Sequence, residues 1–240
     1  EFFFHCSGSS IGFDNVNLNT INLFPVAGDE HDFVSCGLNE PNYLIPIRSK
    51  PLILSTVRSY PGGARNIFLC LESHKKYDLD GLLKENFVNS EIIYLNSKKQ
   101  GNAMTILEAQ PRVGENSPVC VSGSSYILQF NQEKLVHLLE DKGIDVVLLS
   151  FTHHECLLRN PNKYAYAQLR DGKVERISEK KPLSSTPYND HALTGTVFYR
   201  RASDLFDAIR EMTLRTDVKA PYYFITSINE LLKKGKVLLY

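Results

Sequence analysis

The chain has 240 residues, 42% hydrophobic and 22% charged, which is typical of a globular protein long enough for one large domain or two small ones. Basic and acidic residues balance at 27 each, so overall charge gives no case for a nucleic-acid or membrane partner. No apolar run approaches the roughly 20 residues that a membrane helix needs.

Cysteine usage indicates the cellular compartment. The five cysteines are odd in number and widely spaced, with no C-x-x-C pair, at Cys6, Cys36, Cys70, Cys120 and Cys156. This pattern favours buried thiols in a reducing compartment over a disulfide framework, so we expect a cytoplasmic protein. No neighbouring residue in the sequence activates any of these thiols, which favours structural cysteines over nucleophiles.

The first 20 residues are rich in Ser, Gly and Asn and show no sustained period. We interpret residues 1–20 as a lead-in or the remnant of a preceding domain, with room for an edge strand at 1–6. The chain begins without Met, which we interpret as a segment of a longer protein.

From Ile21 onward, short apolar runs alternate with helical patterns. The expected strands are 21–26, 66–71, 91–95, 119–122 and 146–151, and the expected helices are 51–59, 79–86, 103–109 and 132–141. Continuous apolar strands in alternation with helices favour a mainly parallel sheet with helices on both faces.

The pattern changes after residue 160. Alternation over 164–169, an Asp171-Gly172 turn and a return over 174–177 predict an antiparallel ribbon. A further strand is expected over 192–199, then a helix capped by Ser203 through Met212, a helix over 223–233, a C-cap at Gly235 and a strand over 237–240. No linker interrupts residues 21–240, so we expect one domain.

Several local features have a functional and a plain interpretation. His153-His154-Glu155-Cys156 contains zinc-ligand types, but adjacent residues point apart, which favours a polar loop. The lysine pairs 75–76, 98–99 and 180–181 are interpreted as solvated. The last pair directly follows Glu179 and precedes Pro182, which is a more informative context. The aromatic residues Tyr222 to Phe224 are interpreted as part of the hydrophobic core, because an apolar helix follows them at once. The alternative is a platform on which a nucleotide base would stack.

The order of segments carries more information than any one of them. The segments are INLFPVAG, PNYLIPIRSKPLI, KKQGNAMTILEA, VCVSGSSYI, GKVERISEKKP, ALTGTVFYR and YYFITSINELLKKGK. In this order and spacing the chain resembles the sugar-phosphate nucleotidyltransferase family from Ile21 to Tyr240. The resemblance implies a Rossmann-like three-layer α/β/α fold, related to glycosyltransferase A, with a mainly parallel central sheet and an antiparallel ribbon.

The resemblance also implies a phosphate-binding loop after the first strand. The family's A-G-x-G-x-R loop is matched by Ala27 and Gly28, but its second glycine is Glu30 and its arginine position falls on or near Asp32. A lysine that the family directs at the phosphates is Asn42 here. Asp29, Glu30 and Asp32 add negative charge where a triphosphate would lie, which opposes its binding.

The nucleotide side is partly retained. The family's base-contacting segment is matched by Gln100, Gly101 and Asn102 at a predicted helix start, where backbone donors are free. Gly123 matches, but the following Mg²⁺-binding aspartate of the family is Ser124. A second metal aspartate of some members has Ser227, or a near neighbour, in its place here.

The sugar-phosphate side is better retained, as Glu179 and Lys180 of the family's E-K-P motif and as Gly195. The resemblance implies transfer of a nucleotidyl group from a nucleoside triphosphate to a sugar 1-phosphate or similar phosphate, with Mg²⁺ as cofactor and release of pyrophosphate.

Three hypotheses follow. The chain is a nucleotidyltransferase whose catalytic groups come from other positions, such as Arg48, Lys50 or Asp190. Alternatively, it is a catalytically inactive module that binds a sugar phosphate, a nucleotide sugar, or a fused or partner domain. The third hypothesis is a divergent glycosyltransferase, or a site for Mn²⁺ or Mg²⁺ rebuilt from residues 29–32.

Overall fold

The computed structural model describes residues 19–28, 37, 40–60, 65–234 and 237–240, and centres on one nine-stranded sheet. The strands of this sheet are β1 (Ile21–Pro25), β4 (Arg65–Leu71), β5 (Ser90–Leu95), β6 (Val119–Val121), β7 (Val146–Phe151), β8 (Ala165–Arg170), β9 (Lys173–Glu179), β10 (His191–Tyr199) and β11 (Val237–Leu239). The α-helices are α1 (Leu52–Arg58), α2 (Leu79–Asn86), α3 (Asn102–Leu107), α4 (Gln132–Glu140), α5 (Cys156–Arg159), α6 (Ala202–Thr213) and α7 (Phe224–Leu231).

The main path of the sheet runs β11-β7-β10-β6-β1-β4-β5. Strand β1 pairs in parallel with β4 and β6, β4 with β5, and β7 with β11. Strand β10 is antiparallel and lies between β6 and β7, so these two consecutive strands do not pair with each other. The expected α/β fold with a mainly parallel central sheet is confirmed.

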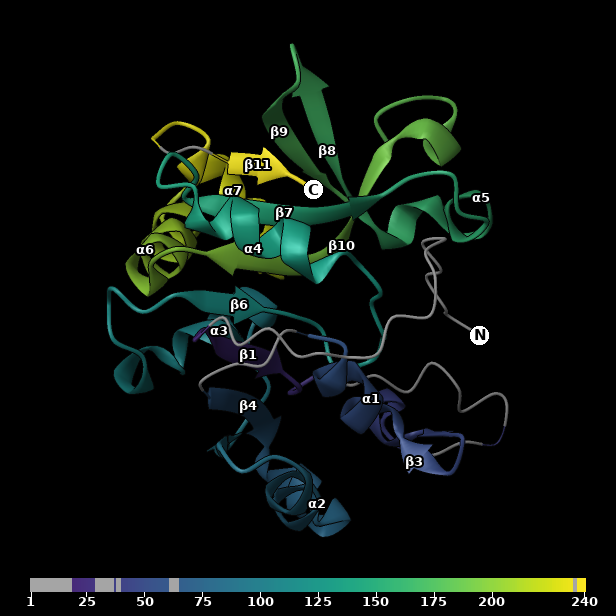
Figure 1. Ribbon diagram of the computed structural model, residues 1–240, viewed down its shortest axis with the longest axis vertical. Helices are drawn as coiled ribbons and strands as arrows, with labels where there is room; N and C mark the ends of the chain where they lie inside the picture. The colour runs from purple at the N-terminus through teal and green to yellow at the C-terminus, as the bar shows by residue number, and fades with distance from the viewer. Residues whose placement is uncertain (1–18, 29–36, 38–39, 61–64, 235–236) are drawn as a thin grey trace.

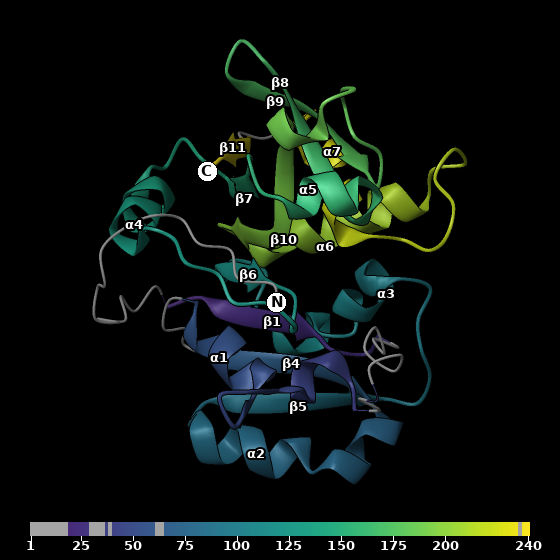
Figure 2. The same cartoon turned by 90° about the vertical axis from the view of Figure 1, so that its right-hand side faces the viewer.

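Helices cover both faces of the sheet, as Figure 2 shows. Because side chains alternate along a strand, neighbouring residues feed different cores. Leu23 belongs to the core under α3, α6 and α7, whereas Phe24 belongs to the core under α1, α2 and α4. The same alternation separates Ile67 from Phe68. The continuous apolar strands of the sequence therefore reflect burial on both faces.

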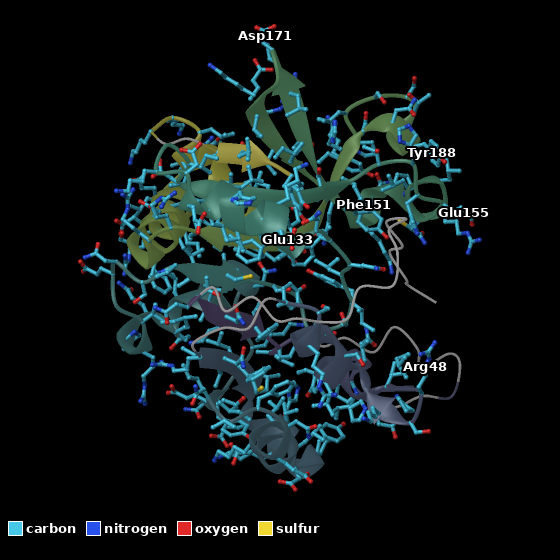
Figure 3. The ribbon with its side chains drawn as sticks, in the orientation of Figure 1. Arg48, Glu133, Phe151, Glu155, Asp171 and Tyr188 are labelled. Atoms are coloured by element: carbon cyan, nitrogen blue, oxygen red, sulfur yellow. The ribbon has the colours of Figure 1, made fainter. Side chains whose placement is uncertain are left out.

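The ribbon of β8 and β9 extends from the sheet (Figure 1), with Asp171 at its tip (Figure 3). Arg170 pairs with Lys173, and Asp171 and Gly172 have φ values of +51° and +73°. These values are those of a type I′ turn, which confirms the expected Asp-Gly hairpin.

The predicted cap of α6 is wrong. The helix begins at Ala202, and Ser203 lies in its first turn instead of before it. The backbone N–H of Ala202 donates to the carbonyl of Ser117, and that of Ser203 donates to the carbonyl of Glu115. Carbonyls distant in sequence thus accept hydrogen bonds from first-turn N–H groups of α6, which a capping side chain would otherwise accept.

A two-stranded hairpin and a short helix were absent from the expectations. Strands β2 (Pro46–Ile47) and β3 (Lys50–Pro51) form a separate hairpin, and α1 begins after Pro51, one residue later than predicted. Helix α5 begins inside the stretch interpreted as a polar loop. The expected strand at 1–6, the acidic loop 29–32 and the cap at Gly235 lie outside the described residues. None of the described helices is long and apolar enough to span a bilayer.

Candidate functional site

A cleft of about 920 Å³ opens where β1 and β6 end, between the β2–β3 hairpin on one side and β8, β9 and β10 on the other. The carboxyl ends of parallel strands are where open α/β sheets form ligand sites. The starts of α3 and α7 complete the lining. The cleft thus draws on segments from Pro25 to Ile225, far apart in the sequence.

Most residues expected at the site line this cleft. They are Ala27, Gly28, Asn42, Gly101, Asn102, Gly123, Ser124, Glu179, Lys180 and Gly195. Gln100 is not part of the lining, and Glu30 and Asp32 lie outside the described residues. Of the alternative catalytic positions, Arg48 lines the cleft, whereas Lys50 and Asp190 do not. The Asp190 carboxylate instead accepts hydrogen bonds from the backbone of Leu183 and Ser184, at 2.8 and 3.0 Å.

The described lining is strongly basic. It contains one carboxylate, Glu179, and the basic residues Arg48, Lys98, Lys99, Lys163 and Lys180. Lys99 is partly neutralised by Glu108, at 2.6 Å. The sequence analysis interpreted Lys98 and Lys99 as a solvated pair and did not single out Lys163, because a lysine carries no sign of a cleft until the fold brings the segments together.

Arg48 lies at the turn of the β2–β3 hairpin, on the same side of the molecule as Glu155 and Tyr188 (Figure 3). Its φ is +49° and that of Ser49 is +65°. Non-glycine residues rarely adopt this left-handed conformation, so the hairpin is under backbone strain at the edge of the cleft.

The start of α3 is packed against the segment that leads into α7. Tyr222 donates its N–H to the carbonyl of Gln100 (2.8 Å) and accepts from Ala103 (3.1 Å), and Asn102 Oδ1 accepts from Phe224 N–H (2.9 Å). A Cβ on Gly101 would lie 2.1 Å from the Tyr222 carbonyl oxygen. The Gly101 N–H donates to the Lys99 carbonyl at 2.9 Å, so the expectation of a free backbone donor is wrong for Gly101. Gly101 instead serves this close approach to Tyr222.

Three buried hydroxyls tie the floor of the cleft together. Ser122 follows β6 and bonds Tyr60, which follows α1. Thr196 on β10 lies 3.1 Å from the Tyr60 hydroxyl and 3.2 Å from that of Ser122. Burial raises the pKa of Tyr60 well above its ordinary value, so the phenol stays neutral. The hydroxyls satisfy one another away from water.

The two positions expected to hold metal carboxylates differ in their surroundings. Ser124 lines the cleft, and its carbonyl accepts a 3.5 Å bond from the Thr56 hydroxyl. Ser227 is fully buried and donates to the Phe224 carbonyl at 2.6 Å, so it lies in the core under α7. Neither serine supplies a charged ligand for a cation.

Glu179 is the last residue of β9, and Lys180 follows it; both line the cleft on the side opposite the β2–β3 hairpin. Burial raises the pKa of Glu179 to about 7, and the nearby Lys180 offsets only part of this rise. Glu179 Oε2 is buried without a hydrogen-bond partner among the described residues. The ammonium of Lys180 lies 2.6 Å from the Tyr223 hydroxyl and 4.2 Å from the centre of that ring. Tyr223 therefore packs against the core and also lines the site.

The side chains of His153, His154, Glu155 and Cys156 do not come together as a metal site. His153 and Glu155 are exposed, whereas Cys156 is buried and begins α5. The Nδ1 of His154 accepts from the backbone of Cys156 at 3.2 Å. In the described part of the chain, no group of three or more His, Cys, Asp or Glu residues is arranged to hold a metal ion.

The described cysteines are structural. Cys70, Cys120 and Cys156 are free and buried. Burial raises the pKa of Cys70 to about 12 and also raises those of the other two thiols. A thiol with a raised pKa is a poor nucleophile at neutral pH, which confirms the expectation for these three residues.

Comparison with known proteins relates this fold to nucleotidyltransferases. No protein-family model and no curated protein matches the sequence. Among solved structures, a nucleoside-diphosphate-sugar pyrophosphorylase from Vibrio cholerae aligns with a TM-score of 0.69 and 20% identity over 91% of each chain. A UDP-glucose pyrophosphorylase in complex with UDP-glucose aligns with a TM-score of 0.68 and 17% identity over 93% of this chain and 90% of that one.

The inositol-1-phosphate CTP transferase from T. maritima aligns with a TM-score of 0.68 and 14% identity, over 92% of this chain and 84% of the other. Similarity at this level of identity shows the fold. The chain has the fold of these nucleotidyltransferases, and the resemblance inferred from the order of its segments is confirmed at that level.

Proposed function

We infer that this chain is a nucleotidyltransferase-like binding module, which holds a sugar phosphate or a nucleotide sugar in the cleft without turning it over. The observation that carries the proposal is the charge of the described lining, with five basic residues against one carboxylate. The whole chain has a formal net charge of zero, so the excess of basic residues in the described lining is not a property of the chain as a whole. A local excess of one charge attracts ligands of the other, here phosphates.

The energies support a phosphate ligand. A unit charge about 4 Å from a phosphate contributes on the order of 4 kcal/mol at an effective dielectric of 20, before desolvation is subtracted. Lys163 and Lys180 both line the cleft, and the hydrogen bond from the Lys180 N–H to the Tyr164 carbonyl (3.0 Å) brings their segments together. An anion at this side of the cleft is attracted by both lysines.

The described residues do not fit Mg²⁺, the cofactor that the resemblance implies. Proteins usually bind Mg²⁺ through one or two carboxylates, together with water and substrate phosphates. The one described carboxylate of the lining, Glu179, is buried, has a raised pKa and lies beside Lys180. Ser124 and Ser227 supply no charge. Catalysis of phosphoryl chemistry depends on neutralising anions with metal and basic groups, so this donor set favours binding over turnover.

Calorimetry with glucose 1-phosphate and UDP-glucose, with and without Mg²⁺, tests the proposal. We expect binding that does not require Mg²⁺ and weakens as salt is raised, because salt screens charge pairs. Lys163→Ala should weaken it, whereas Lys173→Ala, at the exposed tip of the ribbon, is the matched control and should not. Absence of binding by both probes, or equal effects of the two substitutions, would overturn the proposal.

Nucleotidyl transfer is the competing function and has its own test. Nucleoside triphosphates are incubated with glucose 1-phosphate and Mg²⁺, and pyrophosphate is measured. We expect no release above the protein-free control. Release that disappears in the Lys180→Ala variant would establish transfer and refute the inactive module.

A further inference from the structure

A tyrosine ring lies across the floor of the cleft against two glycines from different strands. Gly123 follows β6, and Gly195 lies in β10, where its register against β7 shifts. The Tyr126 hydroxyl accepts a 3.0 Å hydrogen bond from the N–H of Gly123. Tyr126 therefore lies where the β6 and β10 sides of the cleft meet.

The space occupied by the phenol is the space that side chains at both glycines would need. A Cβ on Gly123 would lie 2.4 Å from Tyr126 Cε1, and a Cβ on Gly195 would lie 2.9 Å from the Tyr126 hydroxyl oxygen. A ligand that approaches either glycine backbone from the cleft meets the same ring. Both glycines line the cleft and are half-buried, and Tyr126 occupies the space beside each of them where a side chain would lie.

The segment that carries Tyr126 is fixed on both sides of this residue. The Ser124 carbonyl accepts from the Thr56 hydroxyl at 3.5 Å, and the Leu128 N–H donates to the Ser59 hydroxyl at 3.3 Å. Tyr126 itself packs against the core under α1, α2 and α4. With its backbone held at both ends, the ring can leave the floor only by rotation of its side chain.

The floor beneath is equally fixed. Ser122, directly before Gly123, and Thr196, directly after Gly195, are joined to each other and to Tyr60 by the buried hydroxyl bonds. The strands cannot separate to make room without breaking these bonds. A ligand that spans the two sides must therefore pass over the phenol or displace it.

We propose that Tyr126 is a specificity-determining residue that limits the length of the ligand. With the ring in place, the cleft accepts a ligand confined to one side, of the sugar-phosphate class, and excludes from the floor a nucleotide sugar, which extends over both. This inference rests on the proposed function and narrows its ligand. The side chain acts by its bulk, with the ring beside Gly123 and the hydroxyl oxygen beside Gly195.

The test compares two probes, glucose 1-phosphate and UDP-glucose, in four proteins by calorimetry: wild type, Tyr126→Ala, Tyr126→Phe and Tyr188→Ala. Wild type should bind glucose 1-phosphate more tightly than UDP-glucose. Tyr126→Ala should bind UDP-glucose about tenfold more tightly or better, since displacing a packed ring is a cost that this ligand no longer bears. Its affinity for glucose 1-phosphate should change less than about twofold.

Two further variants isolate the side chain. Tyr126→Phe keeps the ring against Gly123 but removes the hydroxyl oxygen, the atom nearest Gly195, so its gain in UDP-glucose affinity should be smaller than that of Tyr126→Ala. Tyr188→Ala removes a half-buried tyrosine outside the cleft and should change neither affinity. If Tyr126→Ala does not fold, Tyr126→Leu replaces it, because leucine keeps apolar contact with the core while lacking the reach of the phenol.

The outcomes separate this inference from the proposed function. Glucose 1-phosphate binding with an unchanged preference in Tyr126→Ala overturns the role of Tyr126 alone. Weaker binding of both probes by that variant also overturns it, since the ring would then support the ligand. If no variant binds either probe, the role of Tyr126 and the proposed function both fail.

Discussion

Gly101→Ala should destabilise the chain more than alanine at the other described glycines with positive φ, which are Gly37, Gly172 and Gly195. Gly101 has φ +100° and ψ 165°, a conformation that residues with a Cβ essentially do not adopt. The added Cβ would lie 2.1 Å from the carbonyl oxygen and 2.5 Å from the nitrogen of Tyr222, both backbone atoms that no side-chain rotation can move away.

The magnitude follows from two costs. The backbone conformation costs about 1 to 3 kcal/mol. Displacing the Tyr222 segment costs about 1 to 3 kcal/mol more, as overpacking does in a core. The sum, about 2 to 6 kcal/mol, is a large share of the roughly 5 to 15 kcal/mol by which domains are stable.

Chemical denaturation gives the free energy of unfolding, with Gly172→Ala as the matched control. Gly172 also has a positive φ, +73°, but a Cβ there would meet nothing within 4 Å. The control therefore measures backbone strain at a turn, about 1 to 2 kcal/mol. If the two variants lose equal stability with unchanged denaturant dependence, the close packing of Gly101 on Tyr222 does not contribute, and the reasoning is refuted.

Three further predictions concern the cleft. Burial raises the pKa of Glu179 from 4.5 to about 7, so the folded state holds this proton more tightly than the unfolded state. The stability that the proton supplies is lost as pH rises through this range. The free energy of unfolding of wild type, relative to that of Glu179→Gln, should therefore fall by about 3 kcal/mol between pH 4.5 and pH 7. A difference that is constant over this range, in denaturation at several pH values, would contradict the burial of the carboxyl. Lys180→Ala should weaken glucose 1-phosphate binding by about 1 to 3 kcal/mol in calorimetry, because a charge-assisted hydrogen bond is lost. An unchanged affinity would mean that Lys180 does not contact the phosphate. Tyr60→Phe should cost about 1 to 3 kcal/mol in thermal or chemical unfolding, since it leaves Ser122 and Thr196 with fewer partners; a neutral result would mean that water or the two remaining hydroxyls compensate.

Much of the fold could be predicted because it depends on local patterns in a fixed order. The continuous apolar strands indicated burial on both faces, and Asp171-Gly172 indicated a tight hairpin. Ser203 failed as a cap because the competing acceptors, at Ser117 and Glu115, are brought to the helix only by the tertiary fold. A capping side chain is only one way to satisfy the first N–H groups of a helix, and distant backbone carbonyls can accept these hydrogen bonds instead.

The site was less predictable than the fold. Motif positions such as Gly123 and Glu179 were placed in one cleft by the order of segments. Lys98 was interpreted as part of a solvated pair and Lys163 was not singled out, since a lysine on a surface loop and a lysine on a cleft wall look alike in sequence. Tyr126 gave none either, because its contact with Gly195 depends on how two strands distant in sequence are paired.

The position of β10 has a consequence for how the chain acquires its fold during synthesis. Strands β6 and β7 are neighbours in sequence, yet each pairs with β10, which is made later. Until residues 191–199 leave the ribosome, both strands present the edges that β10 will occupy, and such edges are prone to association with other chains. Fragments that end before His191 should therefore aggregate, and a pause in translation ahead of this strand should be more harmful than a pause after it.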